Sequence, residues 1–329
     1  MRARRLVVLT AALALAAGAC QTDLPTGIGG APVASDGGAS AAEGAASAVA
    51  EPPLDPVRQA AFDAQARADL AADVVRRTER ARRTYGDDVP LRVESGLFVL
   101  VGAERGVPFD AAADLAQRAL DVYLGSFFAR RPDRAVTVYL VRSAAPFSQL
   151  CAARFPSGCE GDLGAYSRTM RDIVVNLGPG LPTLTHELVH PLVQTDFPRA
   201  PAWFEEGIAS LFEKPVFDPP GELHGATNWR YDRLAAALAT PAQQPKVHAQ
   251  ALFHMSDFVL DDFDRDLHYA MARMFCQWLD QRGQLWAFYR AWRDGVAGDQ
   301  TGEKSFAQVT GLTPEEADAP WLEWVKRGR

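Results

Sequence analysis

The chain has 329 residues, of which 48% are hydrophobic and 23% charged, and its formal net charge at pH 7 is -7. This composition is typical of a globular protein that can bury a sizeable core, and the length suggests one or two domains. No long run of Lys or Arg is present in the sequence, so the electrostatic footprint of a nucleic-acid-binding protein is absent.

Residues 1–19 have the pattern of an export signal. MRARR supplies a positive start, and the apolar run from Leu6 to Ala17 is shorter than a bilayer span. The segment resembles a bacterial lipoprotein signal, which implies that Cys20 is lipidated and anchors the mature protein in the cell envelope. Gln21 then favours the outer membrane, facing the periplasm, over the inner membrane. Ordinary signal-peptidase cleavage is the alternative, because Ala17 stands where a leucine is usual.

Two further segments precede the main domain. Residues 20–53 are rich in Gly, Ala, Ser and Pro with almost no large apolar side chains, which predicts a flexible tether. Residues 54–90 form an N-terminal segment whose helical pattern runs from Asp55 to Arg83. This helix either packs against the main domain or extends the tether. We place the main domain at residues 91–329.

The sequence pattern in the first part of the main domain predicts a βαβ unit followed by a hairpin. The two strands of the unit are 93–101 and 135–141, and Asp110 is the expected N-cap of the helix between them. A short helix and the two strands of the hairpin follow at 147–154, 164–167 and 172–177.

The stretch HELVH carries the first metal-binding signal. His186 and His190 stand four residues apart, so on a helix both imidazoles leave the same face and can bind one ion, with Glu187 beside them. Thr183 is the expected N-cap of this helix. Pro191 removes the N–H that would bond to the carbonyl of Glu187, so it either tunes the angle of His190 or ends the regular helix there.

A catalytic zinc takes three protein ligands and leaves one position for water, so a third ligand must come from elsewhere. PAWFEEGIASLF predicts a second helix with one packed apolar face and its acids on the other side. Glu206 is the expected third ligand, and its neighbour Glu205 is the alternative.

HELVH followed by PAWFEEGIA resembles the peptidase MA-like domains, which are gluzincins related in their active site to thermolysin and the M1 aminopeptidases. In that family the glutamate directly before the glycine is the third zinc ligand, and it falls on Glu206. Metzincins are disfavoured, because their third histidine and bridging glycine would fall on Asp196 and Val193.

The resemblance covers about residues 91–329. It implies an α+β fold of the thermolysin and M1 type, with a small βαβ-plus-hairpin sheet, the zinc helix and a mostly helical C-terminal part. It also implies that the strand just before the zinc helix, Asp172 to Leu177, edges the cleft and can pair with an extended substrate.

The same resemblance implies one zinc per chain and a hydrolytic mechanism. Zinc would lower the pKa of a bound water and polarise the scissile carbonyl, while Glu187 takes the water proton and delivers it to the leaving amine. Related gluzincins supply a Tyr or His for the oxyanion from a helix well downstream. Tyr269 is the first candidate here and His268 the second.

The remaining cysteines have structural interpretations. Cys151 and Cys159 are eight residues apart in a loop-like stretch, and an exported compartment permits disulfides, so we predict that they pair. Cys276 stands among apolar residues and is expected to be a small core residue.

The sequence thus favours a membrane-anchored zinc metallopeptidase that acts on peptide or protein substrates. No GxMEN-type exopeptidase motif is present, which favours an endopeptidase. The alternatives are a zinc-binding scaffold lipoprotein without turnover and a zinc amidase that acts on cell-wall peptides.

Overall fold

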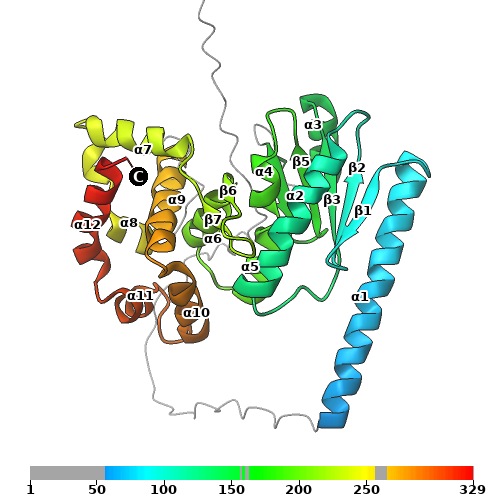
Figure 1. Cartoon of the computed structure of the whole chain (residues 1–329), viewed down its shortest axis with the longest axis horizontal. Helices are drawn as coiled ribbons and strands as arrows, with labels where there is room; N and C mark the ends of the chain where they lie inside the picture. Colours follow the sequence, from blue (N-terminus) through cyan, green and yellow to red (C-terminus); the bar gives the residue numbers. More distant parts are fainter. Residues whose placement is uncertain (1–55, 156–157, 160–162, 256–264, 329) are drawn as a thin grey trace, which may run out of the picture.

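The computed structural model describes residues 56–155, 158–159, 163–255 and 265–328. The predicted signal peptide, Cys20 and the tether lie outside this part of the chain. Helices dominate around one small mixed sheet, so the fold is α+β as predicted (Figure 1). None of the described helices is long and apolar enough to cross a membrane.

A five-stranded sheet in the order β1-β2-β3-β5-β4 organises the N-terminal half. The central strands β2, β3 and β5 are parallel, and β1 and β4 join them antiparallel at the two edges. The strands are β1 Leu91–Glu94, β2 Phe98–Gly102, β3 Val136–Val141, β4 Gly164–Ser167 and β5 Asp172–Asn176. The predicted βαβ unit is β2, α2 and β3, and the predicted hairpin is β4 and β5.

Two predictions about the sheet are wrong. Residues 93–101 form two antiparallel strands, because the chain turns at Ser95 and Gly96, whose φ angles are 52° and 64°. Positive φ at two successive positions suits a tight hairpin turn, and the Ser-Gly pair was the signal for it. The second error concerns the edge of the sheet. Strand β5 lies between β3 and β4, so the segment from Asp172 to Leu177 is internal and the outer strand is β4.

Helices cover both faces of the sheet (Figure 1). On one face, Val99, Val101 and Tyr139 pack against α1 and α3, and on the other, the alternating residues such as Leu100 and Val138 pack against α2 and α4. The covering helices in the first half are α1 Pro56–Tyr85, α2 Phe109–Val122, its π-helical continuation η1 Tyr123–Phe127, and α3 Ala144–Arg154.

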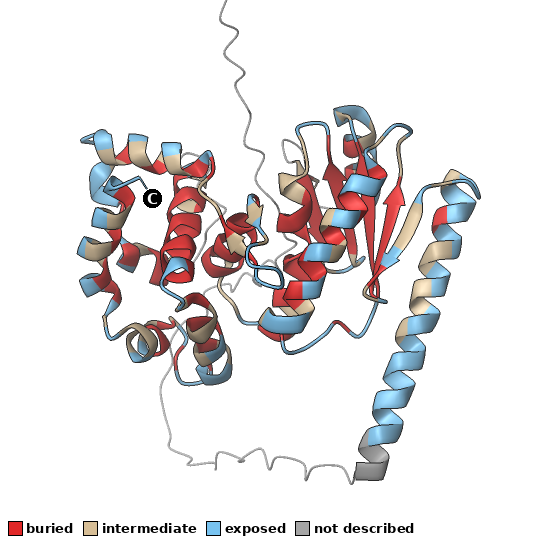
Figure 2. Cartoon of the chain, in the orientation of Figure 1, coloured by how far each residue is buried: buried red, intermediate tan, exposed pale blue. Residues whose placement is uncertain are grey.

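Helix α1 packs on the main domain through its C-terminal half. Ala81 is only 2% exposed, and the Arg77 guanidinium donates hydrogen bonds of 2.9 Å to both Asp172 and Thr137. Residues 60–69 are exposed, as Figure 2 shows. The predicted helix is therefore confirmed, and it is docked on the sheet at one end.

The two predicted N-caps are displaced. Helix α2 has Pro108 at its N-cap, with Asp110 already inside the first turn, where a negative charge suits the helix dipole. Leu181 takes the cap of the helix that carries His186, and Thr183 lies within it.

The C-terminal half is built on α9, which packs against α6, α7, α8, α10 and α12 and is buried along most of its length (Figure 2). Its helices are α4 Pro182–Glu187, α5 His190–Asp196, α6 Ala202–Leu211, α7 Arg230–Ala239, η2 Gln244–Lys246, α8 Ala249–Phe253, α9 Arg265–Gln281, α10 Leu285–Gly295, α11 Glu303–Thr310 and α12 Pro314–Lys326. A short hairpin, β6 Pro215–Val216 and β7 His224–Gly225, follows α6.

Helix α6 approaches α9 closely at Gly207. A Cβ there would lie 2.8 Å from Cys276 Sγ and 2.9 Å from the carbonyl oxygen of Ala272, so only glycine fits without a shift. Cys276 is buried in this contact, as predicted, and burial raises the pKa of its thiol. Such a thiol is poorly suited to act as a nucleophile.

Cys151 and Cys159 lie at disulfide distance, with their Cα atoms 5.6 Å apart. Both are buried beside the sheet face that α1 and α3 cover. The predicted pair is confirmed.

Candidate metal centre

The two histidines of HELVH come from two short helices. Helix α4 ends at Glu187 and α5 begins at His190. Between them the Val189 N–H donates to the His186 carbonyl, 3.1 Å away, which is a tighter turn than the α-helix makes. Pro191 has no N–H with which to continue the regular pattern. The two imidazoles still face each other, with ring centroids 5.1 Å apart.

Glu206 on α6 completes the cluster. Its Oε2 lies 3.3 Å from His186 Nε2, and its Oε1 lies 4.0 Å from His190 Nε2. One ligand atom from each of the three residues lies within 4.8 Å of the others. Within the described residues, this is the only group of three or more His, Cys, Asp or Glu side chains that could hold an ion.

The converging donor atoms are not satisfied by the protein. His186 Nε2, His190 Nε2 and Glu206 Oε2 are buried and make no hydrogen bond within the part of the chain that the structure describes. A buried polar atom left without a partner costs roughly 1–3 kcal/mol, and of these atoms only His186 Nε2 and Glu206 Oε2 lie close enough to each other for an ion pair, so the cluster could hold a cation that all three residues share. Two imidazoles and one carboxylate form a donor set that zinc and other first-row transition metals accept.

The other nitrogen of each imidazole faces a second carboxylate. His190 Nδ1 lies within hydrogen-bond distance of Glu205 Oε1, at 3.0 Å, whereas His186 Nδ1 lies 3.4 Å from Glu213 Oε1, an ion-pair contact without hydrogen-bond geometry. A carboxylate in this position commonly orients a metal-binding histidine. Glu205, the alternative third ligand, therefore contacts the far side of His190, and the geometry favours Glu206.

The cluster attracts positive charge. Burial on its own would lower the pKa of His186, but the carboxylates of Glu206 and Glu213 raise it to about 10. The pKa of His190 is also raised, against the effect of burial, mainly by Glu206 and Glu205. Conversely, burial would raise the pKa of Glu206, and the two imidazoles lower it. A divalent cation bound here would balance the negative charge of the same carboxylates, in place of the protons that it displaces from the imidazoles.

Glu187 is buried beside the outer strand of the sheet. It is 1% exposed, and a Cβ placed on Gly164 in β4 would lie 2.5 Å from its Oε1. Among the described strands, β4 pairs with β5 alone, so β4 is an outer strand of the sheet, and Glu187 lies against its face at Gly164. This strand, and not the segment from Asp172 to Leu177, has the position expected of a substrate-pairing edge.

The two oxyanion candidates lie on α9. Tyr269 is fully buried, and its ring centroid is 4.7 Å from the guanidinium carbon of Arg230. Its neighbour His268 is partly buried. Neither is one of the converging donors, and the oxyanion role remains a prediction for both.

Glu213 and Arg230 were not singled out from the sequence. Glu213 follows Glu206 by seven residues but lies beyond the end of α6, so helical spacing did not point to it. Arg230 had no sequence signal either, because it reaches the site only through the fold.

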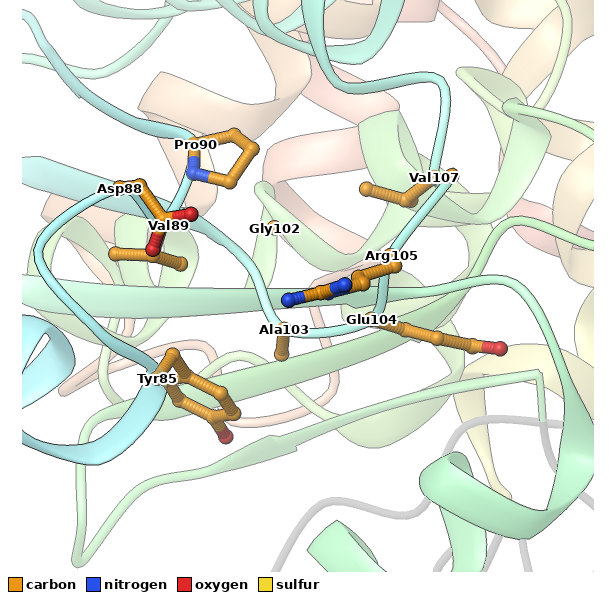
Figure 3. A pocket seen from close by; sticks show the side chains of 10 residues that line it. Tyr85, Asp88, Val89, Pro90, Gly102, Ala103, Glu104, Arg105 and Val107 are labelled. Atoms are coloured by element: carbon orange, nitrogen blue, oxygen red, sulfur yellow. The ribbon is translucent and has the colours of Figure 1, made fainter.

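A separate pocket of about 230 Å³ lies where β1 begins and β2 ends (Figure 3). Its wall includes Tyr85, Arg105 and Glu104. The Glu104 carboxylate already accepts hydrogen bonds from the Arg142 N–H at 2.7 Å and the Ser143 hydroxyl at 2.8 Å. The carboxylate in this pocket is therefore already hydrogen-bonded, so the pocket is a weaker candidate for a functional site than the histidine cluster.

Comparison of the chain with protein-family models and with curated proteins finds no match.

Proposed function

We propose that this chain is a zinc-dependent metallopeptidase that hydrolyses peptide bonds in the cell envelope, anchored through a lipid on Cys20. The observation that carries the proposal is the convergence of three buried, unbonded donor atoms from His186, His190 and Glu206. The adjacent Glu187 supports hydrolysis over simple metal storage, because a storage site has no need of a base.

Each residue has a defined task in this proposal. His186, His190 and Glu206 hold the metal, which supplies Lewis acidity to the scissile carbonyl and acidifies water. Glu187 takes the proton of the attacking water and passes it to the leaving amine. Tyr269 donates a hydrogen bond to the developing oxyanion, with His268 as the second candidate.

Substrate binding in this proposal uses the edge of β4. An extended peptide would add to that edge through backbone hydrogen bonds, which favours unfolded or flexible protein segments. Gly164 keeps the strand close to Glu187, so a peptide bound there would lie beside the proposed base.

The first test is the metal content of the purified full-length chain and of two variants, measured by mass spectrometry. We expect near one zinc per chain, lost in Glu206→Ala and retained in Glu187→Ala. An exposed acid, Glu222→Ala, is the matched control and should change nothing. A well-folded unaltered chain that takes up no zinc would contradict the proposal.

The second test is cleavage of a quenched-fluorescence peptide library. Removal of a general base typically lowers the rate by roughly 100- to 10,000-fold, so Glu187→Ala should be nearly inactive while still loaded with zinc. Zinc binding without cleavage by the unaltered chain would favour a scaffold, and cleavage confined to cell-wall peptides would favour an amidase.

The lipid anchor has its own test, which is phase partition in detergent. Cys20→Ser should shift the chain from the detergent phase to the aqueous phase, and unchanged partition would count against lipidation.

A further inference from the structure

Glu213 is held on two sides by the segment that begins α7. The Arg230 guanidinium forms two hydrogen bonds with its carboxylate, Nε to Oε2 at 2.8 Å and Nη2 to Oε1 at 2.5 Å. Asn228 Nδ2 donates a third hydrogen bond of 2.8 Å to Oε2. The guanidinium fork fixes the plane of the carboxylate as well as its position. Glu213 therefore has little freedom to turn away from His186 Nδ1, 3.4 Å away.

Arg230 is itself immobilised. Its guanidinium carbon lies 4.7 Å from the ring centroid of Tyr269, within the range of a cation–π contact. Its backbone N–H donates to Asn228 Oδ1 at 3.1 Å. The guanidinium is thus held between the Tyr269 ring and the Glu213 carboxylate, and the backbone of Arg230 is anchored to Asn228.

A neighbouring pair of contacts joins the segment that carries His186 to the segment that carries Glu213. The Thr185 hydroxyl donates to the Phe212 carbonyl at 2.6 Å, and the Tyr123 hydroxyl donates to the Thr185 carbonyl at 3.2 Å. The residue before His186 is therefore tied to the residue before Glu213. Helix α4 and the end of α6 are held in register at the metal centre.

A purely stabilising role explains this arrangement poorly. Glu213 and Arg230 are 6% and 5% exposed, and a buried ion pair typically loses in desolvation about as much as it gains in attraction. An apolar pair could fill the same space, but it could not present a carboxylate to the far nitrogen of a metal ligand.

We infer that Arg230 is a positioning residue for the metal centre, which acts through Glu213 to hold the His186 ring with Nε2 toward the metal. The inference deepens the proposed function and rests on it, since it requires the cluster to bind a metal. Arg230 itself touches neither the metal nor the substrate.

The test is a double-mutant cycle on metal affinity. The zinc dissociation constant is measured by chelator competition for the unaltered full-length chain, Arg230→Gln, Glu213→Gln and the double variant. Loss of an outer partner of a metal ligand typically weakens binding 10- to 100-fold, and we expect this from each single variant. The double variant should be no weaker than Glu213→Gln alone, because Arg230 acts only through Glu213.

Two controls separate positioning from folding. Arg77→Gln removes a comparably placed Arg–carboxylate pair, with Asp172, on the sheet face away from α4. It should lower the melting temperature but leave zinc affinity within about twofold, because it has no contact with the metal ligands. Arg230→Lys keeps the charge but not the fork, and it should bind zinc more weakly than the unaltered chain. Cobalt substitution adds a spectrum that reports the ligand geometry in each variant.

Unchanged zinc affinity in a folded Arg230→Gln chain, or additive losses in the double variant, would overturn the inference while leaving the proposed function intact. Failure of the unaltered chain to bind zinc would overturn both.

Discussion

The substitution Gly164→Ala would test the role of Glu187 without touching a metal ligand. A Cβ at position 164 would lie 2.5 Å from Glu187 Oε1 and 2.8 Å from its Cγ, and it would also overlap the methyl group of Thr183. Ordinary contact begins at 3.4 Å, so the carboxylate must retreat by about 0.9 Å or the strand must move away.

The expected effect follows from that displacement. A misplacement of about 1 Å at a reacting group can cost roughly 100-fold in rate, equivalent to about 2.7 kcal/mol of transition-state stabilisation. Zinc content should stay near that of the unaltered chain, because Glu187 is not among the converging donors. Overpacking should lower the free energy of unfolding by about 1–3 kcal/mol, so activity must be measured well below the melting temperature.

The assay is kcat on a cleavable peptide, with zinc content determined on the same preparation. Gly125→Ala is the matched control, because a Cβ there meets no described atom within 4 Å. Full activity in a zinc-loaded Gly164→Ala chain would refute the reasoning that close contact with β4 fixes the position of Glu187. Loss of zinc together with activity would show that the strand positions the metal ligands instead.

Three further predictions concern the zinc helices, the pH dependence and the disulfide. Pro191→Ala should leave zinc content unchanged, because the histidine rings are oriented by their carboxylate partners; a large loss would show that the break in the helix sets the site. In the metal-free chain the raised pKa of His186 should add stability below about pH 6.5, and that stability should fall as the pH rises toward about 10. Thermal melts with a chelator should show this decline and melts with zinc should not, since bound imidazoles are neutral; identical pH profiles would contradict it. Replacing Cys151 and Cys159 together by serine should lower the free energy of unfolding by about 2–3 kcal/mol in the chain-entropy model, measured by denaturant titration, and an unchanged midpoint would argue against the bond.

The features that followed from the sequence are those set by local spacing. A spacing of four residues from His186 to His190 suffices to place both rings on one side, even though they lie on two short helices. The adjacent acids Glu205 and Glu206 were both identified, and the resemblance already favoured Glu206, with which the directions of the two side chains from α6 agree.

The features that did not follow are those set by long-range packing. The order of the strands depends on the pairing of β5 with β3, which lies far away in the sequence, so no local pattern could show that β4 and not β5 lies at the edge. Arg230 pairs with Glu213 across the whole β6–β7 segment, and neither lies in a motif. The hairpin at Ser95 and Gly96 was local, and it was missed because the apolar residues on both sides were taken as one strand.

The proposed metal ligands of the centre lie on helices of the C-terminal half, and the sheet reaches the centre through β4, which packs against α4. The outer strand β4 packs against Thr183 and Glu187 of α4, while Glu206, Glu213 and Arg230 belong to the helical half around α9. Substitutions in the core between α6 and α9, such as at Gly207, should therefore weaken metal binding, because they move the third ligand relative to both histidines. Substitutions along β4 should instead change turnover or substrate preference while the metal stays bound. Metal affinity and peptide cleavage are thus separable by the half of the fold in which a change is made.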